Sequence, residues 1–189
     1  MADEWRHPEL GRFQLVADRW EREMRVPAFD AFSFEPTCCE SGQIDNRFEL
    51  FFYAESIEDT PSDDMIRVAK LVLRDPARIV ALVSTALWED FNGRGSDSGM
   101  WWHGDLAEVG EALADEELPP PAGPEDVRKL LGLSWIGIRR QDERLGRPVA
   151  ELSFGAAFEE EHGVGVLTDG ERVVGIGYST TVETFEGEG

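Results

Sequence analysis

The stretch that decides the fold runs from Phe158 to Tyr178 and reads FEEEHGVGVLTDGERVVGIGY. Two runs rich in valine flank Asp169-Gly170, and an Asp-Gly pair between such runs strongly indicates a β-hairpin because both turn residues tolerate positive φ. In the matching register one set of side chains faces another across the two strands. The facing sets are Val164, Val166 and Thr168 in the first strand and Val174, Ile176 and Tyr178 in the second.

Further strands are predicted on both sides of the chain. Two precede the hairpin, over residues 133–140 and 148–154, and with it they predict a four-strand antiparallel meander at the C-terminus. Near the N-terminus the alternation of apolar and polar side chains predicts a first hairpin over residues 13–26 and a short strand over 29–34. The aromatic run from Arg47 to Ala54 is typical of a buried strand.

Helical signals lie between these two groups of strands. Thr60 and Asp75 are each followed by proline, and this order indicates the N-cap and first residue of two helices. Apolar residues recur at helical spacing from Met65 to Trp88, and Asn92-Gly93 is a stop signal. A short helix is also expected over residues 124–131.

These elements predict an α+β fold in which an antiparallel β-sheet with a C-terminal meander packs against a helical hairpin. We expect one domain over residues 1–182 and a flexible acidic tail over 183–189.

The chain is strongly acidic, with a net charge of -21 over 189 residues. Such a charge repels nucleic acid and anionic membranes and attracts basic proteins, although it also serves plain solubility. No stretch approaches the roughly 18 apolar residues that span a bilayer, and the N-terminus lacks the apolar core of a signal peptide. We therefore expect a cytoplasmic protein. Cys38-Cys39 is an adjacent pair, for which inert buried thiols are expected rather than half of a thiolate metal site.

One segment concentrates the acidity. Residues 105–127 hold eight acidic side chains and no basic one, and they follow the aromatic run Met100-Trp101-Trp102-His103. We expect a weak helix followed by an exposed, partly extended segment. The two tryptophans either anchor a partner or pack into the core. The predicted partner-binding residues are Trp101, Trp102, His103, Glu108, Glu111, Asp115, Glu116 and Glu117.

A second candidate site lies just before the hairpin, where Glu160 and His162 would point to the same side of a strand. A metal-dependent hydrolase could use this pair, with His103 as a further ligand, but two ligands on one face fall short of the three or four that zinc requires. The other interpretation is a structural corner. The sequence contains no phosphate-binding loop and no nucleophile elbow, so we expect no catalytic residues, no cofactor and no bound metal.

The pattern Phe158-x-x-Glu161-His162-Gly163-x-Gly165 resembles a family of uncharacterised bacterial domains of unknown function. Those domains carry an aromatic-x-x-Glu-His-Gly-x-Gly motif near the C-terminus, with tryptophan more often in the aromatic position. The motif residues in this chain are Phe158, Glu160, Glu161, His162, Gly163 and Gly165.

The resemblance implies no activity, but similar small acidic proteins include immunity partners of bacterial toxins. Resemblance and charge together predict a non-catalytic protein-binding module, of the immunity or antitoxin type, that neutralises a basic partner.

Overall fold

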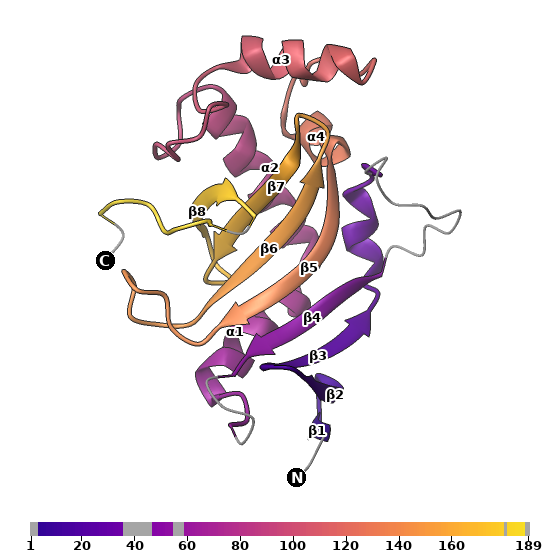
Figure 1. Cartoon of the computed structure of the whole chain (residues 1–189), viewed down its shortest axis with the longest axis vertical. Coiled ribbons are helices and arrows are strands. Elements are labelled where there is room, and N and C mark those ends of the chain that lie inside the picture. Colours follow the sequence, from indigo (N-terminus) through magenta and orange to yellow (C-terminus); the bar gives the residue numbers. More distant parts are fainter. Residues whose placement is uncertain (1–3, 36–46, 55–58, 180, 188–189) are drawn as a thin grey trace.

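The computed structural model describes residues 4–35, 47–54, 59–179 and 181–187, so Cys38 and Cys39 lie outside the described residues. One eight-stranded sheet dominates the described chain, and its strands lie in the order β1 to β8 (Figure 1). Neighbouring strands are antiparallel except for β4 and β5, which are parallel. The expected α+β class is confirmed.

Within the described residues the structure contains eight strands, four α-helices and two short 3-10 helices. The strands are β1 (Glu4–His7), β2 (Gly11–Val16), β3 (Arg19–Met24), β4 (Phe48–Tyr53), β5 (Leu131–Arg139), β6 (Val149–Ala156), β7 (Glu159–Thr168) and β8 (Val173–Tyr178). The helices are η1 (Pro27–Ala31), α1 (Asp63–Arg74), α2 (Pro76–Phe91), α3 (Leu106–Asp115), α4 (Pro124–Val127) and η2 (Arg128–Leu130). None of the described helices is long and apolar enough to cross a membrane.

The core lies between one face of the sheet and helices α1 and α2, which run behind the sheet in Figure 1. Strand β4 shows why, because Phe48, Leu50 and Phe52 alternate with side chains of the opposite face and are buried in the same cluster as the apolar side of α1. Helix α1 contacts β5 and β6, and α2 contacts β8. Helix α3 and strand β1 lie at opposite ends of the long axis of the molecule (Figure 1).

Two strand assignments differ from those expected near the N-terminus. The predicted strand over 29–34 is wrong, because Pro27 begins the 3-10 helix η1. Phe29 and Phe32 are three residues apart, which places both rings on one side of such a turn, and both are buried. Strand β1 was not expected from its charged sequence. It pairs with β2 next to the first hairpin, β2–β3, which is confirmed.

The helix starts are partly as expected. Asp75 caps α2 as predicted, since its carboxylate accepts the backbone N–H of Arg78 at 3.2 Å. The predicted start of α1 at Thr60-Pro61 is wrong by two residues. Ser62 is the N-cap there, and its Oγ accepts the N–H of Met65 at 3.3 Å.

The parallel pairing of β4 with β5 follows from what connects them. All four α-helices lie in this connection, which crosses from one strand to its neighbour and lets both run in the same direction. The chain therefore places the N-terminal strands and the C-terminal strands in a single sheet.

The β7–β8 hairpin is confirmed, but its turn is longer than a two-residue Asp-Gly turn. The strands end at Thr168 and resume at Val173, with a register shift, and of the Asp-Gly pair only Gly170 has positive φ. A Cβ on Gly170 would lie 2.5 Å from Cβ of Leu71, so the turn sits directly against α1.

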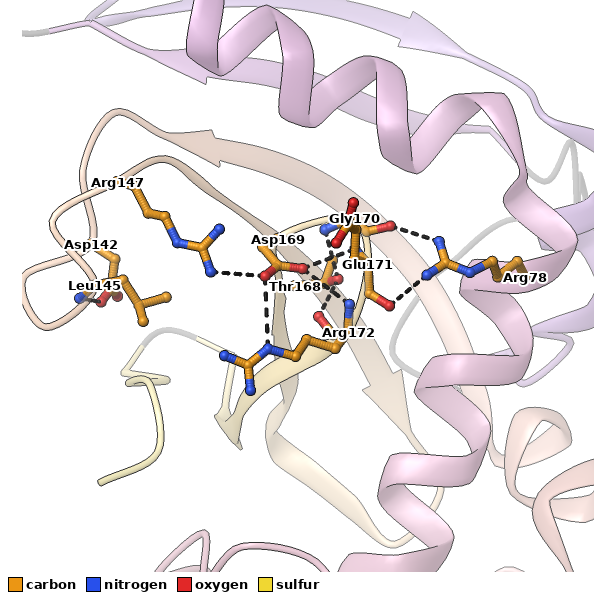
Figure 2. Close-up of polar contacts among 9 residues, drawn as sticks. All are labelled: Arg78, Asp142, Leu145, Arg147, Thr168, Asp169, Gly170, Glu171 and Arg172. Carbon is orange, nitrogen blue, oxygen red and sulfur yellow. Dashed lines mark hydrogen bonds and ion pairs between the residues drawn. The ribbon is translucent and has the colours of Figure 1, made fainter. Parts of the chain in front are cut away.

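Charged side chains hold this turn in place (Figure 2). The Asp169 carboxylate accepts the N–H groups of Glu171 and Arg172 at 2.8 and 3.0 Å, and Arg147 donates to it at 2.9 Å. From α2, Arg78 donates to the carbonyls of Gly170 and Glu171. Burial alone would raise the pKa of Asp169, but these N–H donors and Arg147 outweigh it and lower the pKa.

The segment after β8 folds back over the sheet. Val182 packs on Gly165 of β7, where a Cβ would lie 2.8 Å from the valine side chain. Thr184 is buried and donates to Asp142, and the Phe185 N–H donates to the Val174 carbonyl at 2.8 Å. Residues 183–185, which the sequence assigned to a tail, thus lie against β8.

Candidate functional site

The aromatic run that follows α2 forms a turn packed onto the start of β7. Trp102 is fully buried, and its ring meets Phe158 at 5.5 Å and Tyr178 at 5.6 Å in edge-on contacts. Phe91 closes the cluster from the end of α2, 5.0 Å from the Phe158 ring. Trp102 is therefore a core residue, and its predicted place in a partner-binding surface is wrong in this structure.

Trp101 is only half-buried and occupies the rim of the same cluster. Its indole Nε1 donates to the Glu159 carboxylate at 2.9 Å, which fixes the orientation of the ring. The ring also meets Trp102 edge-on at 5.6 Å. Of the two tryptophans, Trp101 is the one that a partner could reach.

His103 anchors the turn through Asp90, a residue that the sequence did not single out. The imidazole Nδ1 lies 2.6 Å from the Asp90 carboxylate, which is 1% exposed. Ser98 donates to the same carboxylate at 3.1 Å, and the Asp90 carbonyl accepts the N–H groups of Gly93 and Gly104. Asp90 thus ties the end of α2 to both ends of the loop that leads to α3.

The electrostatics of Asp90 reflect this burial. Burial raises the pKa of Asp90 above its ordinary value of 3.8, and the contacts with His103, Ser98 and Trp102 oppose that rise. The indole N–H of Trp102 makes no hydrogen bond of normal geometry within the described residues. It nevertheless lies close enough to Asp90 to favour the ionised carboxylate.

The glutamate that contacts His162 is Glu159 rather than Glu160. One oxygen of Glu159 accepts both the backbone N–H of His162 and its Nδ1–H, each at 3.1 Å. The His162 ring lies 4.6 Å from the Tyr178 ring. Burial alone would raise the pKa of Glu159, but the bonds from Trp101 and His162 outweigh it and lower the pKa. Glu160 and Glu161 are exposed.

The glycines of the motif, Gly163 and Gly165, allow the backbone of β7 to pack closely against its neighbours. Gly163 has φ +64°, and a Cβ there would lie 2.4 Å from the Phe154 carbonyl oxygen. Gly165 leaves room for Val182, as described above. Phe158, Glu159, His162 and the glycines therefore shape a tight bulge on which the Trp101 turn rests. The structure gives these motif residues packing and hydrogen-bonding roles.

The acidic residues of the other predicted set lie on and just after α3. Glu108, Glu111 and Asp115 share one exposed side of the helix, while Val109 and Leu113 on the other side are fully buried. Glu117 is exposed and Glu116 is half-buried. Among the residues that the structure describes, no ion pair involves any of these five carboxylates. The predicted helix is confirmed.

The metal-site alternative finds no support in the geometry. His103 faces Asp90 and Asp97, His162 faces Glu159 and Glu161, and His7 accepts N–H groups of its own turn through Nδ1. Across the described ranges no group of three or more histidine, cysteine, aspartate or glutamate side chains is placed to hold a metal ion.

Sequence reasoning named Trp101, Phe158 and His162 among the candidates but did not predict that they lie in one cluster. It missed Asp90 and Glu159, the two carboxylates that hold the cluster together. For Glu159 a signal existed, because it opens the run of three glutamates before His162. For Asp90 the available sign was its position, because it continues the helical spacing of the apolar residues Val83 and Leu87 at the end of α2.

Comparisons with known proteins give one match. Residues 11–183 match the model of a family described as a domain of unknown function (DUF6985). No curated protein and no solved structure matches the chain. Since the family model spans most of the 189 residues, the chain belongs to the DUF6985 family.

Proposed function

We propose that this chain is a non-catalytic module of the immunity or antitoxin type that binds and neutralises a basic protein in the bacterial cytoplasm. The contact surface is the acidic face of α3, formed by Glu108, Glu111, Asp115 and Glu117 and bordered by Glu116. The observation that carries the proposal is that three of these acidic side chains, Asp115, Glu116 and Glu117, stand at the C-terminal end of α3, where they oppose the stability of their own helix.

The C-terminal end of α3 shows this cost most clearly. Asp115, Glu116 and Glu117 stand at the negative end of the helix dipole, where acidic side chains are unfavourable. The helix ends in a Schellman motif, in which the N–H of Glu117 bonds to the Ala114 carbonyl and that of Leu118 to the Leu113 carbonyl.

The residue that this motif places in the left-handed region is Glu117, with φ +56°. Glycine is the residue that this position favours, because a Cβ is strained there. A sequence selected for helix stability alone would carry glycine at this position and basic residues around it. Such local violations are typical of functional surfaces.

An acidic face of this kind suits a protein whose own surface is positive, such as a toxin directed at nucleic acid. Complementary charge speeds association and makes it sensitive to salt. Trp101 supplies an aromatic side chain that can be desolvated on binding, and its ring is oriented in advance by Glu159. Trp102 is buried and supports the Trp101 ring by packing against it.

Affinity capture from the native host tests the proposal. The wild-type bait is compared with a variant in which Glu108, Glu111 and Asp115 are changed to lysine, at low and at high salt. We expect a basic protein that the wild type retains at low salt only, and that the variant fails to retain. A partner that both baits retain equally, or retention that salt does not weaken, would contradict the proposal.

A further inference from the structure

The strands β2–β5 present one face of the sheet away from the helices. Phe48, Leu50 and Phe52 of β4 face α1 and α2, so the alternate residues of β4 and of the strands paired with it face the other way. We call the surface formed by these alternate residues of β2–β5 the outer face, and in Figure 1 helices α1 and α2 lie behind it. Its members are Arg12, Gln14, Val16, Arg19, Glu21, Glu23, Glu49, Phe51, Tyr53, Trp135, Gly137 and Arg139.

The outer face exposes apolar side chains. Val16 is 43% exposed and Tyr53 is 39% exposed, and no other large apolar side chain among the described residues is exposed to this extent. Val16 pairs with Arg19, and Arg19 pairs with Tyr53, so the three lie side by side on neighbouring strands. Trp135 is half-buried on the same face, and its ring lies 5.2 Å from that of Phe51. Aromatic side chains and arginine are the residues that protein interfaces enrich.

The outer face is also electrically neutral, although the chain carries a net charge of -21. It holds three arginines and three glutamates, which are Arg12, Arg19, Arg139, Glu21, Glu23 and Glu49. All three glutamates are paired, since Glu21 and Glu49 contact Arg19 and Glu23 contacts Arg47. Salt at physiological concentration screens charges that lie more than about 8 Å apart. Two copies of this acidic chain can therefore approach through the outer face without strong repulsion.

Arg19 lies at the centre of this face and is held in a fixed position. Its guanidinium carbon lies 4.4 Å from the centre of the Phe51 ring, and its nitrogens contact Glu21 at 2.7 Å and Glu49 at 3.2 Å. One flat side of the guanidinium is thus covered by Phe51. The side chain is still 34% exposed, so its other flat side is open to a second aromatic ring.

We propose that the outer face binds the outer face of a second copy of this chain and forms a two-fold symmetric dimer. A two-fold axis that runs along the strands, between β3 and β4, places β3 of each copy over β4 of the other. Because Arg19 and Tyr53 are paired neighbours, each Arg19 then stacks on the Tyr53 ring of the second copy. Symmetric dimers use the same patch twice in this way, and sheets pack face to face at about 10 Å.

This arrangement leaves other parts of the chain clear of the interface. The segment after β8 covers β7 and β8, at the far side of the sheet, and the axis places it beyond strand β1 of the second copy. Helix α3 lies at the end of the molecule opposite β1, so its acidic side chains stay accessible (Figure 1). The dimer is therefore independent of the function proposed above, and either can fail without the other.

Sedimentation equilibrium of the full chain tests whether the dimer exists. The outer face has twelve residues, about half of the roughly 20–30 on each side of a standard interface, so we expect a dissociation constant of about 10–100 μM. At physiological salt the mass should rise from that of a monomer at about 5 μM toward that of a dimer at about 500 μM. A monomer at all concentrations, or an assembly larger than a dimer, would overturn the proposal.

The indole N–H resonances locate the contact without any change in sequence. On dilution we expect the Trp135 indole signal and the Arg19 Nε–H signal to shift, because both groups lie on the outer face. The Trp101 indole is the control, since it is bound to Glu159 on a different surface, and its signal should stay constant. A shift at Trp101 with none at Trp135 would place the contact elsewhere and contradict the proposal.

Two pairs of proteins measure the contact. Arg19→Gln and Arg67→Gln each remove one positive charge, but Arg67 lies on α1 and pairs with Asp64 in solvent. We expect the dimer to be at least about tenfold weaker in Arg19→Gln and to change less than about twofold in Arg67→Gln. Tyr53→Ser keeps the charge of the wild type and should weaken the dimer by a similar factor of about ten. Equal affinity within either pair, Arg19→Gln with Arg67→Gln or Tyr53→Ser with wild type, would refute the assigned contact.

Discussion

The acidic side chains on strands β1–β4 and those on α3 differ in their ion pairing. On the strands, arginines face the acids: Glu4 pairs with Arg6 and Arg12, Glu21 and Glu49 with Arg19, and Glu23 with Arg47. On α3 the described residues contain no such pairs, and no lysine or arginine lies between Arg94 and Arg128. The difference teaches that the same acidic chain pairs its carboxylates with arginines on the N-terminal strands and leaves those of α3 without such partners among the described residues.

The most deeply buried of the paired acids is Glu151 on β6. It is 2% exposed and accepts two hydrogen bonds from Arg139, at 2.8 and 3.0 Å. We expect Arg139→Ala to lower the free energy of unfolding by about 3–5 kcal/mol, because it leaves a buried charge without a partner. Urea unfolding at neutral pH measures the loss. Burial raises the pKa of Glu151 above 4.5 despite Arg139, so the loss should shrink as pH falls through that raised pKa and the carboxyl becomes neutral.

The neighbouring Arg140 is the matched control, since its pair with Asp59 is exposed. We expect Arg140→Ala to cost at most about 1 kcal/mol. An equal loss of unfolding free energy in the two variants would show that the buried ion pair is worth no more than the exposed one.

Asp169 gives the next largest effect. Asp169→Asn removes the ion pair with Arg147 and weakens the acceptor of two turn N–H groups, at a cost of about 1.5–3 kcal/mol at neutral pH. Its folded pKa is lowered, so the ionised carboxylate stabilises the fold above 3.8 and this contribution is lost as pH falls through the lower folded value. The gap between wild type and variant should therefore close below about pH 4. A gap that stays constant with pH would contradict this account.

Glu117 is expected to respond in the opposite direction. Glu117→Gly should raise the free energy of unfolding by about 0.5–1 kcal/mol, because glycine removes the strain of φ +56° at the end of α3. Glu116→Gly is the control, since Glu116 has an ordinary negative φ, and it should bring no such gain. Thermal unfolding of both variants separates relief of backbone strain from loss of charge, and a gain of equal size in both would refute the strain argument.

The smallest effect concerns the helix face itself. Glu111 and Asp115 are one turn apart and carry like charges, so Glu111→Gln with Asp115→Asn should stabilise by a few tenths of a kcal/mol. Glu4→Gln, which removes a paired acid from β1, should instead lower the free energy of unfolding. The sign of the two changes, measured by urea unfolding, is the quantity of interest. The same sign in both would show that the α3 acids are ordinary surface charges.

The sequence predicted local features better than long-range ones. The Asp75-Pro76 cap and the β7–β8 hairpin each depend on neighbouring residues, so their signals are complete in the sequence. The parallel contact of β4 with β5 joins strands far apart in the chain and has no local signal.

One irregularity, a β-bulge between β6 and β7, made the prediction of the candidate site incomplete. Strand alternation predicted that Glu160 and His162 face the same way. Between the pairs Ala156–Glu159 and Phe154–Val164, however, β6 has one residue and β7 has four. This bulge breaks the alternation and turns His162 toward Glu159, and only the close approach of Gly163 to β6 shows why it forms.

The most direct test of the account compares two variants of this chain that have the same net charge. The quantity measured is the affinity of each variant for the purified partner. In one, Glu108, Glu111 and Asp115 of α3 become lysine. In the other, the exposed acids Asp18, Glu35 and Glu143 become lysine, so that both variants change net charge equally. We predict at least about tenfold weaker binding for the α3 variant and less than about threefold for the other, at constant salt. Equal weakening of both would show that net charge, rather than the α3 face, holds the partner.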